Sequence, residues 1–186
     1  MPKIQSSIIK VIGVGGGGSN AVNDMFRQGI KGVDFIICNT DAQAMESSPV
    51  PTKIQLGERG LGAGSIPAVG KEAANQKMAQ IREILEKNTQ MVFITAGMGG
   101  GTGTGAAPVI ASIAKDLGIL TVGIVTIPFT FEGRKRKLQA DEGINELRKY
   151  VDTLLLICND KLRELCGDLK LSEAFNKADD ILTTAA

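Results

Sequence analysis

The chain contains no histidine and no tryptophan, and its aromatic share is only 4%. Without histidine, Ser-His-Asp triads, histidine proton shuttles and most catalytic zinc sites are excluded. The scarcity of aromatic side chains argues against the stacking platforms that bind single-stranded nucleic acid. The 21 basic and 20 acidic side chains leave a net charge of +1, which provides no basic field. We therefore expect no nucleic-acid partner.

Cysteine and long apolar segments are also scarce. The three cysteines, Cys38, Cys158 and Cys166, show no CxxC spacing, which indicates a reduced cytoplasmic chain rather than a disulfide-stapled secreted one. The polar start at Met1–Ser7 does not resemble a signal peptide. The longest apolar stretch, Leu120–Phe129, is interrupted and too short to span a bilayer. We expect a soluble protein without direct membrane insertion.

Apolar, β-branched runs alternate with segments of helical periodicity along the 186 residues. The predicted strands are Ile8–Val14, Val33–Cys38, Lys53–Leu56, Met91–Thr95, Leu120–Val125 and Thr153–Ile157. The predicted helices are Ser19 or Asn20 to Gln28, Ala68–Lys87, Ala106–Leu117, Arg134–Tyr150 and Leu171–Ala186, and Gly57–Pro67 is a predicted loop. The pattern predicts a three-layer, Rossmann-like α/β fold with a parallel sheet and helices on both faces. Ligands of such folds bind at the carboxyl ends of the strands.

Glycine is abundant, at 23 residues, and much of it lies in two loops at such strand ends. The first loop, Gly13–Asn20, reads GVGGGGSN and is predicted to open a helix. Glycine lets the backbone approach an anion, and a helix N-terminus offers N–H groups to it. Gly13, Gly15 and Gly18 also fit the GxGxxG pattern of dinucleotide-binding proteins. Asp41 stands where such proteins contact the ribose, so a dinucleotide remains an alternative, as does a turn without a ligand.

The second loop, Gly97–Gly105, reads GMGGGTGTG and also lies between a predicted strand and a helix. Thr102 and Thr104 add hydroxyl groups to its main-chain N–H groups, a composition suited to phosphate oxygens. The chain has no GxxxxGK[ST] motif, which excludes a Walker P-loop. A dinucleotide-binding fold does not need a second cradle. The two loops together indicate a nucleotide polyphosphate held from two sides, and a purely structural glycine run is the alternative.

Five ordered blocks resemble the tubulin/FtsZ family, and its bacterial branch most closely. They are Gly15–Val22, Asn39–Ala44, Gly60–Gly64, the GGGTGTG block at Gly99–Gly105, and Phe131–Arg136. The resemblance extends from about Ile8 to Leu182. It implies a GTP-binding, tubulin-like cytoskeletal protein that polymerises into the bacterial division ring and hydrolyses GTP between subunits. The implied location is the cytoplasm, at the division site.

The resemblance assigns the phosphates of GTP or GDP to three segments. The implied phosphate-binding residues are Gly15, Gly16, Gly17, Gly18, Ser19, Asn20, Gly62, Ala63, Gly64, Gly99, Gly100, Gly101, Thr102, Gly103 and Thr104. In the family, the segment Gly62–Gly64 senses the γ-phosphate. No cluster of carboxylates indicates a protein-built metal site, so Mg²⁺ is expected to be held mainly by phosphates and water.

The ribose and the guanine are assigned to side chains nearer the end of the chain. The implied residues are Glu132, Arg136, Asn159, Phe175 and Asp179. A carboxylate at Asp179 accepts hydrogen bonds from N1–H and the amino group of guanine, whereas adenine presents an acceptor at N1. Alternatives are that Asp180 takes this role, or that Phe175 is core and Asp179 faces solvent. The basic run Arg134–Lys137 could also be a solvated helix face.

The sequence departs from the family pattern in the predicted γ-phosphate loop. Ser65-Ile66-Pro67 stands where the family usually has Ala-Asn-Pro, and the segment Gly57–Arg59 is shorter than usual. Cys158 stands where proline is common. The first two of these changes lie in the loop from Gly57 to Pro67, the segment that the resemblance assigns to the γ-phosphate.

The domain division expected from the resemblance is a GTP-binding domain at 1–171 and the start of a long central helix at 172–186. Thr183–Ala186 supplies no stop signal, which predicts a helix cut short and a fragment of a longer protein. The second domain would carry the catalytic acidic residue for the neighbouring subunit in a head-to-tail filament, and the C-terminal tail would bind division-ring proteins. With no catalytic residue of its own, this chain is expected to bind GTP with negligible turnover.

Two other classes remain as alternatives. A NAD-binding Rossmann oxidoreductase domain is supported by the GxGxxG pattern and Asp41, but not by the second glycine loop. The other alternative is a structural module that binds no nucleotide. It is considered because apolar residues such as Leu182 would normally pack on further structure.

Overall fold

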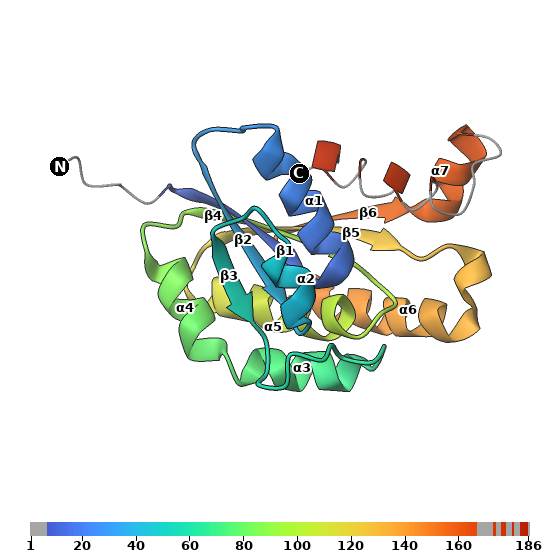
Figure 1. Cartoon of the computed structure of the whole chain (residues 1–186), viewed down its shortest axis with the longest axis horizontal. Helices are drawn as coiled ribbons and strands as arrows, with labels where there is room; N and C mark the ends of the chain where they lie inside the picture. The colour runs from blue at the N-terminus through green and yellow to red at the C-terminus, as the bar shows by residue number, and fades with distance from the viewer. Residues whose placement is uncertain (1–6, 167–172, 174–175, 178–179, 181–182, 186) are drawn as a thin grey trace.

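The structure is a computed structural model that describes residues 7–166, 173, 176–177, 180 and 183–185. Its centre is a six-stranded parallel sheet of order β3-β2-β1-β4-β5-β6 (Figure 1). The strands are β1 (Ile9–Val14), β2 (Val33–Asn39), β3 (Thr52–Gln55), β4 (Met91–Gly97), β5 (Leu120–Ile127) and β6 (Thr153–Cys158). The helices are α1 (Gly15–Arg27), α2 (Ala42–Glu46), α3 (Pro67–Asn75), α4 (Met78–Glu86), α5 (Thr102–Asp116), α6 (Arg134–Arg148) and α7 (Asn159–Cys166), with a 3₁₀ turn η1 (Thr130–Glu132).

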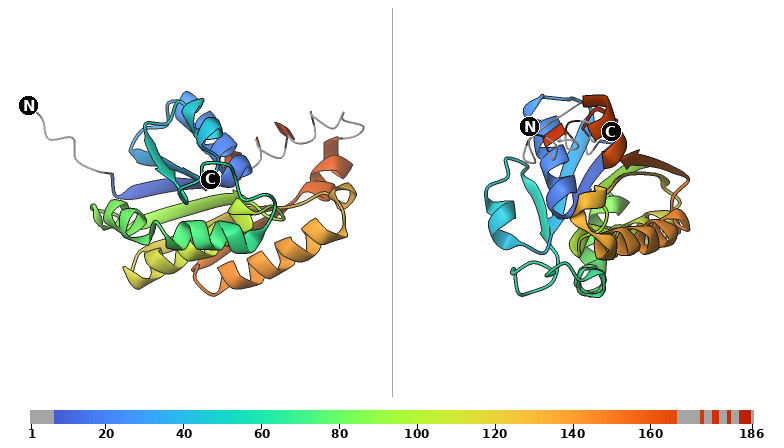
Figure 2. Two further views of the ribbon diagram at one scale, coloured as in Figure 1. Left: turned by 60° about the horizontal axis from the view of Figure 1, so that its bottom comes forward. Right: turned by 90° about the vertical axis from the view of Figure 1, so that its right-hand side faces the viewer.

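The sheet is covered on both faces, as the apolar strands predict. Helices α3, α4, α5 and α6 lie on one face, and α1 and α2 lie on the other (Figures 1 and 2). Alternate residues of one strand pack on opposite faces of the sheet. Ile12 belongs to the cluster under α5, and Val11 belongs to the cluster under α1. This arrangement confirms the predicted three-layer α/β fold.

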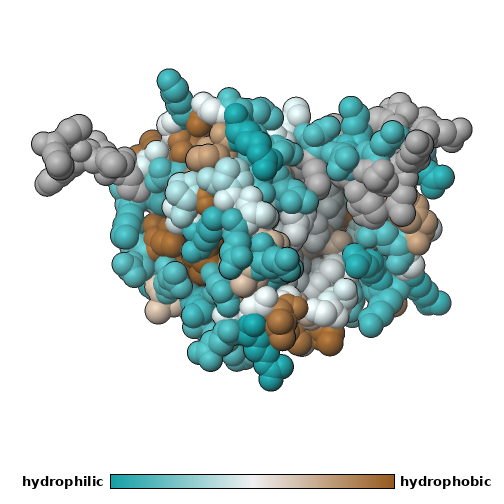
Figure 3. Space-filling view, in the orientation of Figure 1, coloured by the Kyte–Doolittle hydropathy of each residue, from teal (hydrophilic) through white to brown (hydrophobic). Residues whose placement is uncertain are grey.

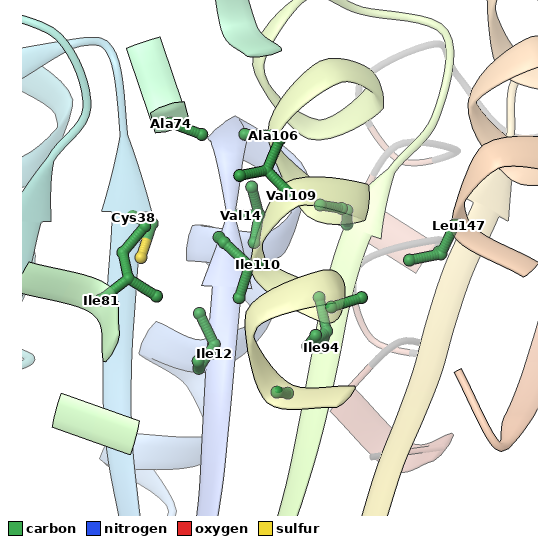
Figure 4. Packing of buried hydrophobic residues seen from close by; sticks show 14 of the residues in the cluster. Ile12, Val14, Cys38, Ala74, Ile81, Ile94, Ala106, Val109, Ile110 and Leu147 are labelled. Atoms are coloured by element: carbon green, nitrogen blue, oxygen red, sulfur yellow. The ribbon is translucent and has the colours of Figure 1, made fainter. Parts of the chain in front are cut away.

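The larger of the two cores lies between the sheet and α5. Ile12 and Ile94 of the sheet meet Ile110 of α5, and Ile81 of α4 and Leu147 of α6 close the cluster at its sides (Figure 4). Each of these side chains is 5% exposed or less. Complete burial of one aliphatic side chain of this size contributes about 1.5–3 kcal/mol, so this layer fixes the sheet beneath both glycine loops.

The predicted helix Ala68–Lys87 is wrong, because the structure divides it into α3 and α4. The backbone leaves the helical region at Lys77, which has φ −113° and ψ 15°. The apolar stripe that suggested one helix includes Met78, yet Met78 is 41% exposed while Ala74 and Ile81 are buried. Two short helices at different angles bury these small and large residues better than one straight helix.

Two short helices were not predicted, α2 and α7, and each directly follows the carboxyl end of a strand. Asp41 caps α2, because its Oδ1 accepts a hydrogen bond of 3.1 Å from the Ala44 N–H. The polar run Asn39-Thr40-Asp41 is compatible with such a cap. Helix α7 begins at Asn159 with Asp160 in its first turn, where a carboxylate is favoured. The predicted helix Leu171–Ala186 lies largely outside the described residues.

Candidate functional site

The two glycine loops meet where the strand order of the sheet reverses. Strands β1 and β4 are neighbours, and Val14 at the end of β1 pairs with Ala96 near the end of β4. The chain then passes into α1 on one face of the sheet and into α5 on the other. Open α/β sheets bind ligands in the crevice that this arrangement creates at the carboxyl ends of the strands.

The first loop is part of a helix, which corrects the predicted start at Ser19 or Asn20. Helix α1 begins at Gly15, with Val14 as an N-cap whose side chain makes no capping hydrogen bond. A Cβ on Gly15 would lie 2.9 Å from the Gly103 nitrogen of the second loop, and one on Gly18 would lie 2.2 Å from the Thr95 oxygen of β4. These glycines let α1 start in contact with β4, so packing overrides the low helix propensity of glycine.

The second loop also becomes helical earlier than predicted, at Thr102 instead of Ala106. The Gly99 N–H donates to the Thr104 Oγ1 at 2.8 Å, which folds the loop over the first turn of α5. The hydroxyls of Thr102 and Thr40 lie 2.6 Å apart, which joins the end of β2 to the same turn. The hydroxyls of Thr102 and Thr104 therefore both hold the second loop in place.

Two glycines of the site have no packing reason to be glycine. Among the described residues, no heavy atom beyond its local backbone lies within 4 Å of the position that a Cβ would take on Gly16 or Gly100. Gly16 lies in the first turn of α1, where glycine costs roughly 0.5–1 kcal/mol relative to alanine. Open space above a costly glycine fits a site where a ligand approaches the backbone.

The predicted γ-phosphate loop reaches the second glycine loop. A Cβ on Gly101 would lie 2.7 Å from the Ala63 Cβ and 2.8 Å from the Ile66 nitrogen, so these segments pack backbone to backbone. The Gly62 N–H donates to the Thr40 carbonyl at 3.1 Å. Gly62 and Gly64 have φ of 80° and 59° with open space at their Cβ positions. The three predicted phosphate segments are therefore contiguous.

Two buried polar atoms of the site lack partners. Within the described part of the chain, Ser19 Oγ and Asn159 Oδ1 make no hydrogen bond, although the two residues are only 6% and 5% exposed. Ser19 lies on α1 after the glycines, and Asn159 begins α7 at the end of β6. Buried polar atoms in native proteins nearly always have partners, so these two fit a site that a polar ligand completes.

Glu132 and Arg136 lie together at the start of α6. The Arg136 Nη1 is 3.3 Å from the Glu132 Oε1, and the second oxygen, Oε2, accepts a hydrogen bond of 2.7 Å from the Phe129 N–H. The side chain of Glu132 is 12% exposed and that of Arg136 is 44% exposed. The acid is therefore held rigidly by its own loop, while the guanidinium remains accessible to a ligand.

Phe175 and Asp179, two predicted base contacts, lie outside the described residues. Asp180, the alternative to Asp179, lines a polar cleft of about 490 Å³ that also includes Asn20 of α1. The described residues that line this cleft are Asn20, Asn23, Asp24, Arg27, Ser47, Asn176 and Asp180. The structure therefore places Asp180 next to one predicted phosphate residue, and the choice between the two acids stays a prediction.

The described residues include no group of three or more cysteine, aspartate or glutamate side chains placed to hold a metal ion. They also include no helix with the length and apolarity needed to cross a membrane.

Comparison with known proteins assigns this geometry to a family. Residues 8–167 match the family model described as "Tubulin/FtsZ family, GTPase domain". The chain belongs to the tubulin/FtsZ family. Proteins named "Cell division protein FtsZ" are 59% identical in Porphyromonas gingivalis and 58% identical in Azotobacter vinelandii, over 96% and 97% of this chain. The alignments cover 40% and 47% of those proteins, so the chain spans less than half of their length.

Solved structures of this family have the same fold. An FtsZ dimer from M. jannaschii superposes with a TM-score of 0.94 at 42% identity, over 98% of this chain and 54% of that one. A CetZ2 from Haloferax volcanii, solved as a GTPγS-bound protofilament, gives a TM-score of 0.83 at 24% identity, over 95% of this chain and 56% of that one. The second likeness supports the fold alone.

Proposed function

We propose that this tubulin/FtsZ-family chain is the GTP-binding part of a GTPase that polymerises for cell division. The observation that carries the proposal is the contact between two glycine loops at the reversal of the strand order. Gly16 and Gly100 leave open space there, and the Ser19 hydroxyl is buried without a partner among the described residues. A polyphosphate between the N-terminal ends of α1 and α5 would meet N–H groups from both sides.

The other assigned residues would contact different parts of the nucleotide. Gly62, Ala63 and Gly64 would complete the phosphate cradle around the γ-phosphate. Glu132 and Arg136 would contact the ribose and the base, and Asn159 would bind the base through its Oδ1, which has no partner among the described residues. Phe175 and Asp179 remain proposed base contacts by resemblance. Mg²⁺ would be held mainly by phosphates and water, since the described residues offer no acidic cluster.

The NAD-binding alternative has no support from the comparisons. Its ribose contact, Asp41, already accepts a hydrogen bond from the Ala44 N–H as the cap of α2. The Thr40 hydroxyl beside it pairs with Thr102 of the second loop. The segment after β2 is therefore packed against the second glycine loop, which a dinucleotide-binding fold does not need.

Self-association into head-to-tail filaments is part of the proposal. FtsZ of M. jannaschii was solved as a dimer. Large apolar side chains are exposed around the carboxyl edge of the sheet in this chain: Leu61 at 84%, Leu138 at 52%, Ile66 at 49% and Phe131 at 48%. On the face seen in Figure 3, apolar patches of this kind interrupt a mostly polar surface, one of them near α3. A neighbouring subunit that covered this edge would bury them and could add a catalytic acid beside the nucleotide.

The cellular role follows from the same relatives. We infer a cytoplasmic protein that acts at the division site and meets other division-ring proteins through a C-terminal tail beyond this chain. Localisation of a fluorescently tagged full-length protein tests this part. Bands at mid-cell agree with it, and a uniform cytoplasmic signal contradicts it.

Calorimetric titration with GTP, ATP and NAD, each with Mg²⁺, tests the binding function. We expect a heat of binding with GTP and none with ATP or NAD. Binding of NAD in preference to GTP would overturn the proposal, as would the absence of GTP binding.

A further inference from the structure

The loop between β5 and α6 is fastened to the first turn of α7 by one carboxylate. Asp160 accepts hydrogen bonds from the Thr130 N–H, with its Oδ1 at 3.0 Å and its Oδ2 at 3.2 Å. Its Oδ2 also accepts the Thr130 hydroxyl. A single side chain therefore binds the main chain and the side chain of a residue 30 positions away.

A second contact supports the same junction through other atoms. The Arg163 guanidinium lies over the Phe131 ring, 5.9 Å from its centroid. Phe131 stacks on Phe129 at 4.7 Å between centroids, and Phe129 is only 2% exposed. The aromatic pair anchors the loop in the core, but Phe131 is 48% exposed, and cation–π contacts at exposed sites are weak. The orientation of the loop toward α7 therefore depends chiefly on the hydrogen bonds to Asp160.

The junction lies between two parts of the proposed nucleoside site. Thr130 is two residues before Glu132, and Glu132 is closed onto the same turn through its hydrogen bond from the Phe129 N–H. Asp160 directly follows Asn159, whose buried Oδ1 has no partner among the described residues. One hydrogen-bonded bridge thus joins the residue proposed for the ribose to the residue proposed for the base.

We propose that Asp160 is a positioning residue, which fixes Glu132 relative to Asn159 so that ribose and base are bound together. This inference rests on the proposed GTP-binding function. Asp160 itself would not touch the nucleotide, because its oxygens are directed to Thr130. Its loss would leave the phosphate segments intact and loosen only the nucleoside side of the site.

The electrostatics of the junction agree with this role. The hydrogen bond from the Thr130 hydroxyl, with that from its N–H and the charges of Arg163 and Lys137, lowers the pKa of Asp160 below its usual value. The carboxylate is therefore ionised at neutral pH. Hydrogen bonds to an ionised acceptor are stronger than those between neutral groups.

The test compares GTP with 2′,3′-dideoxy-GTP, which lacks the ribose hydroxyls, by titration in Mg²⁺. In the unchanged chain, dideoxy-GTP should bind more weakly than GTP. Asp160→Ala should weaken GTP binding about tenfold, because Glu132 and Asn159 would no longer be held in one arrangement. The ratio of the two Kd values should fall toward one, because a displaced Glu132 no longer detects the hydroxyls.

Three further variants separate positioning from general destabilisation. Glu164→Ala removes another acid of α7, which forms an exposed ion pair with Lys161 at 3.1 Å, and should keep the wild-type ratio. Thr130→Ser retains both donors and should also keep it, whereas Thr130→Val removes the hydroxyl and should give an intermediate ratio. Thr130→Val also tests the bridge if circular dichroism shows that Asp160→Ala is unfolded.

The outcomes are distinguishable. A wild-type ratio in folded Asp160→Ala overturns the inference and leaves the proposed function intact, even if both nucleotides bind more weakly. An unchanged chain that binds no GTP overturns the proposed function, and this inference with it. A ratio near one in Asp160→Ala, with wild-type ratios in Glu164→Ala and Thr130→Ser, supports the positioning role.

Discussion

The glycines of the phosphate loops have two different physical reasons to be glycine. At Gly18 and Gly103, a Cβ would lie 2.2 Å and 2.6 Å from main-chain oxygens, so these positions are required by packing. At Gly16 and Gly100, the space is open among the described residues. The run of four glycines in α1 therefore combines positions that packing requires with a position, Gly16, where the proposed phosphate has open space.

Alanine at Gly16 and at Gly18 should separate these two requirements. Gly16→Ala should leave the free energy of unfolding unchanged or raise it by roughly 0.5–1 kcal/mol, because alanine favours the helix. It should weaken GTP binding at least about tenfold, since the methyl group occupies the proposed phosphate space. Gly18→Ala should lower the stability by several kcal/mol, because backbone must move to admit the Cβ.

Thermal unfolding and GTP titration of both variants make the comparison. A Gly16→Ala protein that is as unstable as Gly18→Ala would contradict the open space seen in the structure. A stable Gly16→Ala protein with wild-type affinity for GTP would contradict the placement of the phosphates.

Cys38 and Cys158 should differ sharply in reactivity. Cys38 is completely buried in the larger core, and desolvation raises its pKa to about 12. The thiolate is the reactive form, so at pH 8 only about 1 in 10⁴ of the Cys38 thiols is ionised. Cys158 is partly exposed at the end of β6. Iodoacetamide should modify Cys158 in the native chain and reach Cys38 only after unfolding.

Mass spectrometry of digested protein, with and without denaturant, measures this difference. Saturating GTP should also slow the modification of Cys158, because the next residue is Asn159. Modification of Cys38 at the native rate of Cys158 would mean that the sheet opens far more readily than its packing implies.

At the scale of one element, helix α3 lacks a side-chain cap. Ile66 occupies the N-cap position with φ −111° and ψ 109°, and Pro67 follows it as the first helical residue. Asparagine, the usual family residue at this position, can accept a hydrogen bond from the first turn, which isoleucine cannot. Ile66→Asn should therefore stabilise the chain by about 1 kcal/mol and raise Tm by roughly 2–4 °C.

Ile66→Ala is the matched control for the cap. It removes the same half-exposed apolar side chain without adding an acceptor, so its Tm should lie near that of the unchanged protein. Equal melting temperatures for the asparagine and alanine variants would show that the first turn of α3 does not use a cap.

Secondary structure could be predicted from the sequence where local and tertiary preferences agree. All six strands and the three-layer arrangement follow from apolar runs that alternate with helical segments. The starts of α1 and α5 could not be predicted, because glycine opposes a helix locally and only contact with β4 stabilises it there. The break at Lys77 likewise depends on which neighbours α3 and α4 meet, and no local signal marks it.

The same distinction between local signals and tertiary contacts applies to the site. Both glycine loops are visible in the sequence, and the resemblance supplied the residues assigned to phosphate, ribose and base. Contacts between distant segments are not visible, such as Gly70 of α3 against the second loop, where a Cβ would lie 2.4 Å from the Gly101 oxygen. The bridge from Asp160 to Thr130 is of the same kind. Such pairs depend on the path of the chain in space, and spacing along the sequence does not encode it.

At the scale of the whole molecule, binding and hydrolysis make different demands. The segments proposed to form the phosphate cradle all lie within this chain, and each contacts the next. Among the described residues proposed to surround the nucleotide, the one acid is Glu132, and its oxygens are engaged by the Phe129 N–H and by Arg136. Hydrolysis needs a group that orients the attacking water, so a second subunit is the expected source.

If this chain binds GTP and a neighbouring subunit supplies the catalytic acid, turnover should depend on chain length and on protein concentration. The 186-residue chain should bind GTP yet release phosphate at no more than the rate of GTP in buffer. A chain extended to the length of its relatives should hydrolyse GTP, with a rate per molecule that rises with protein concentration, because the acid arrives from a neighbour. A phosphate-release assay over a hundredfold range of concentration measures both. Turnover by the short chain that is constant across this range would place the catalytic group within it, and the open edge of the sheet would then need no partner to complete the site.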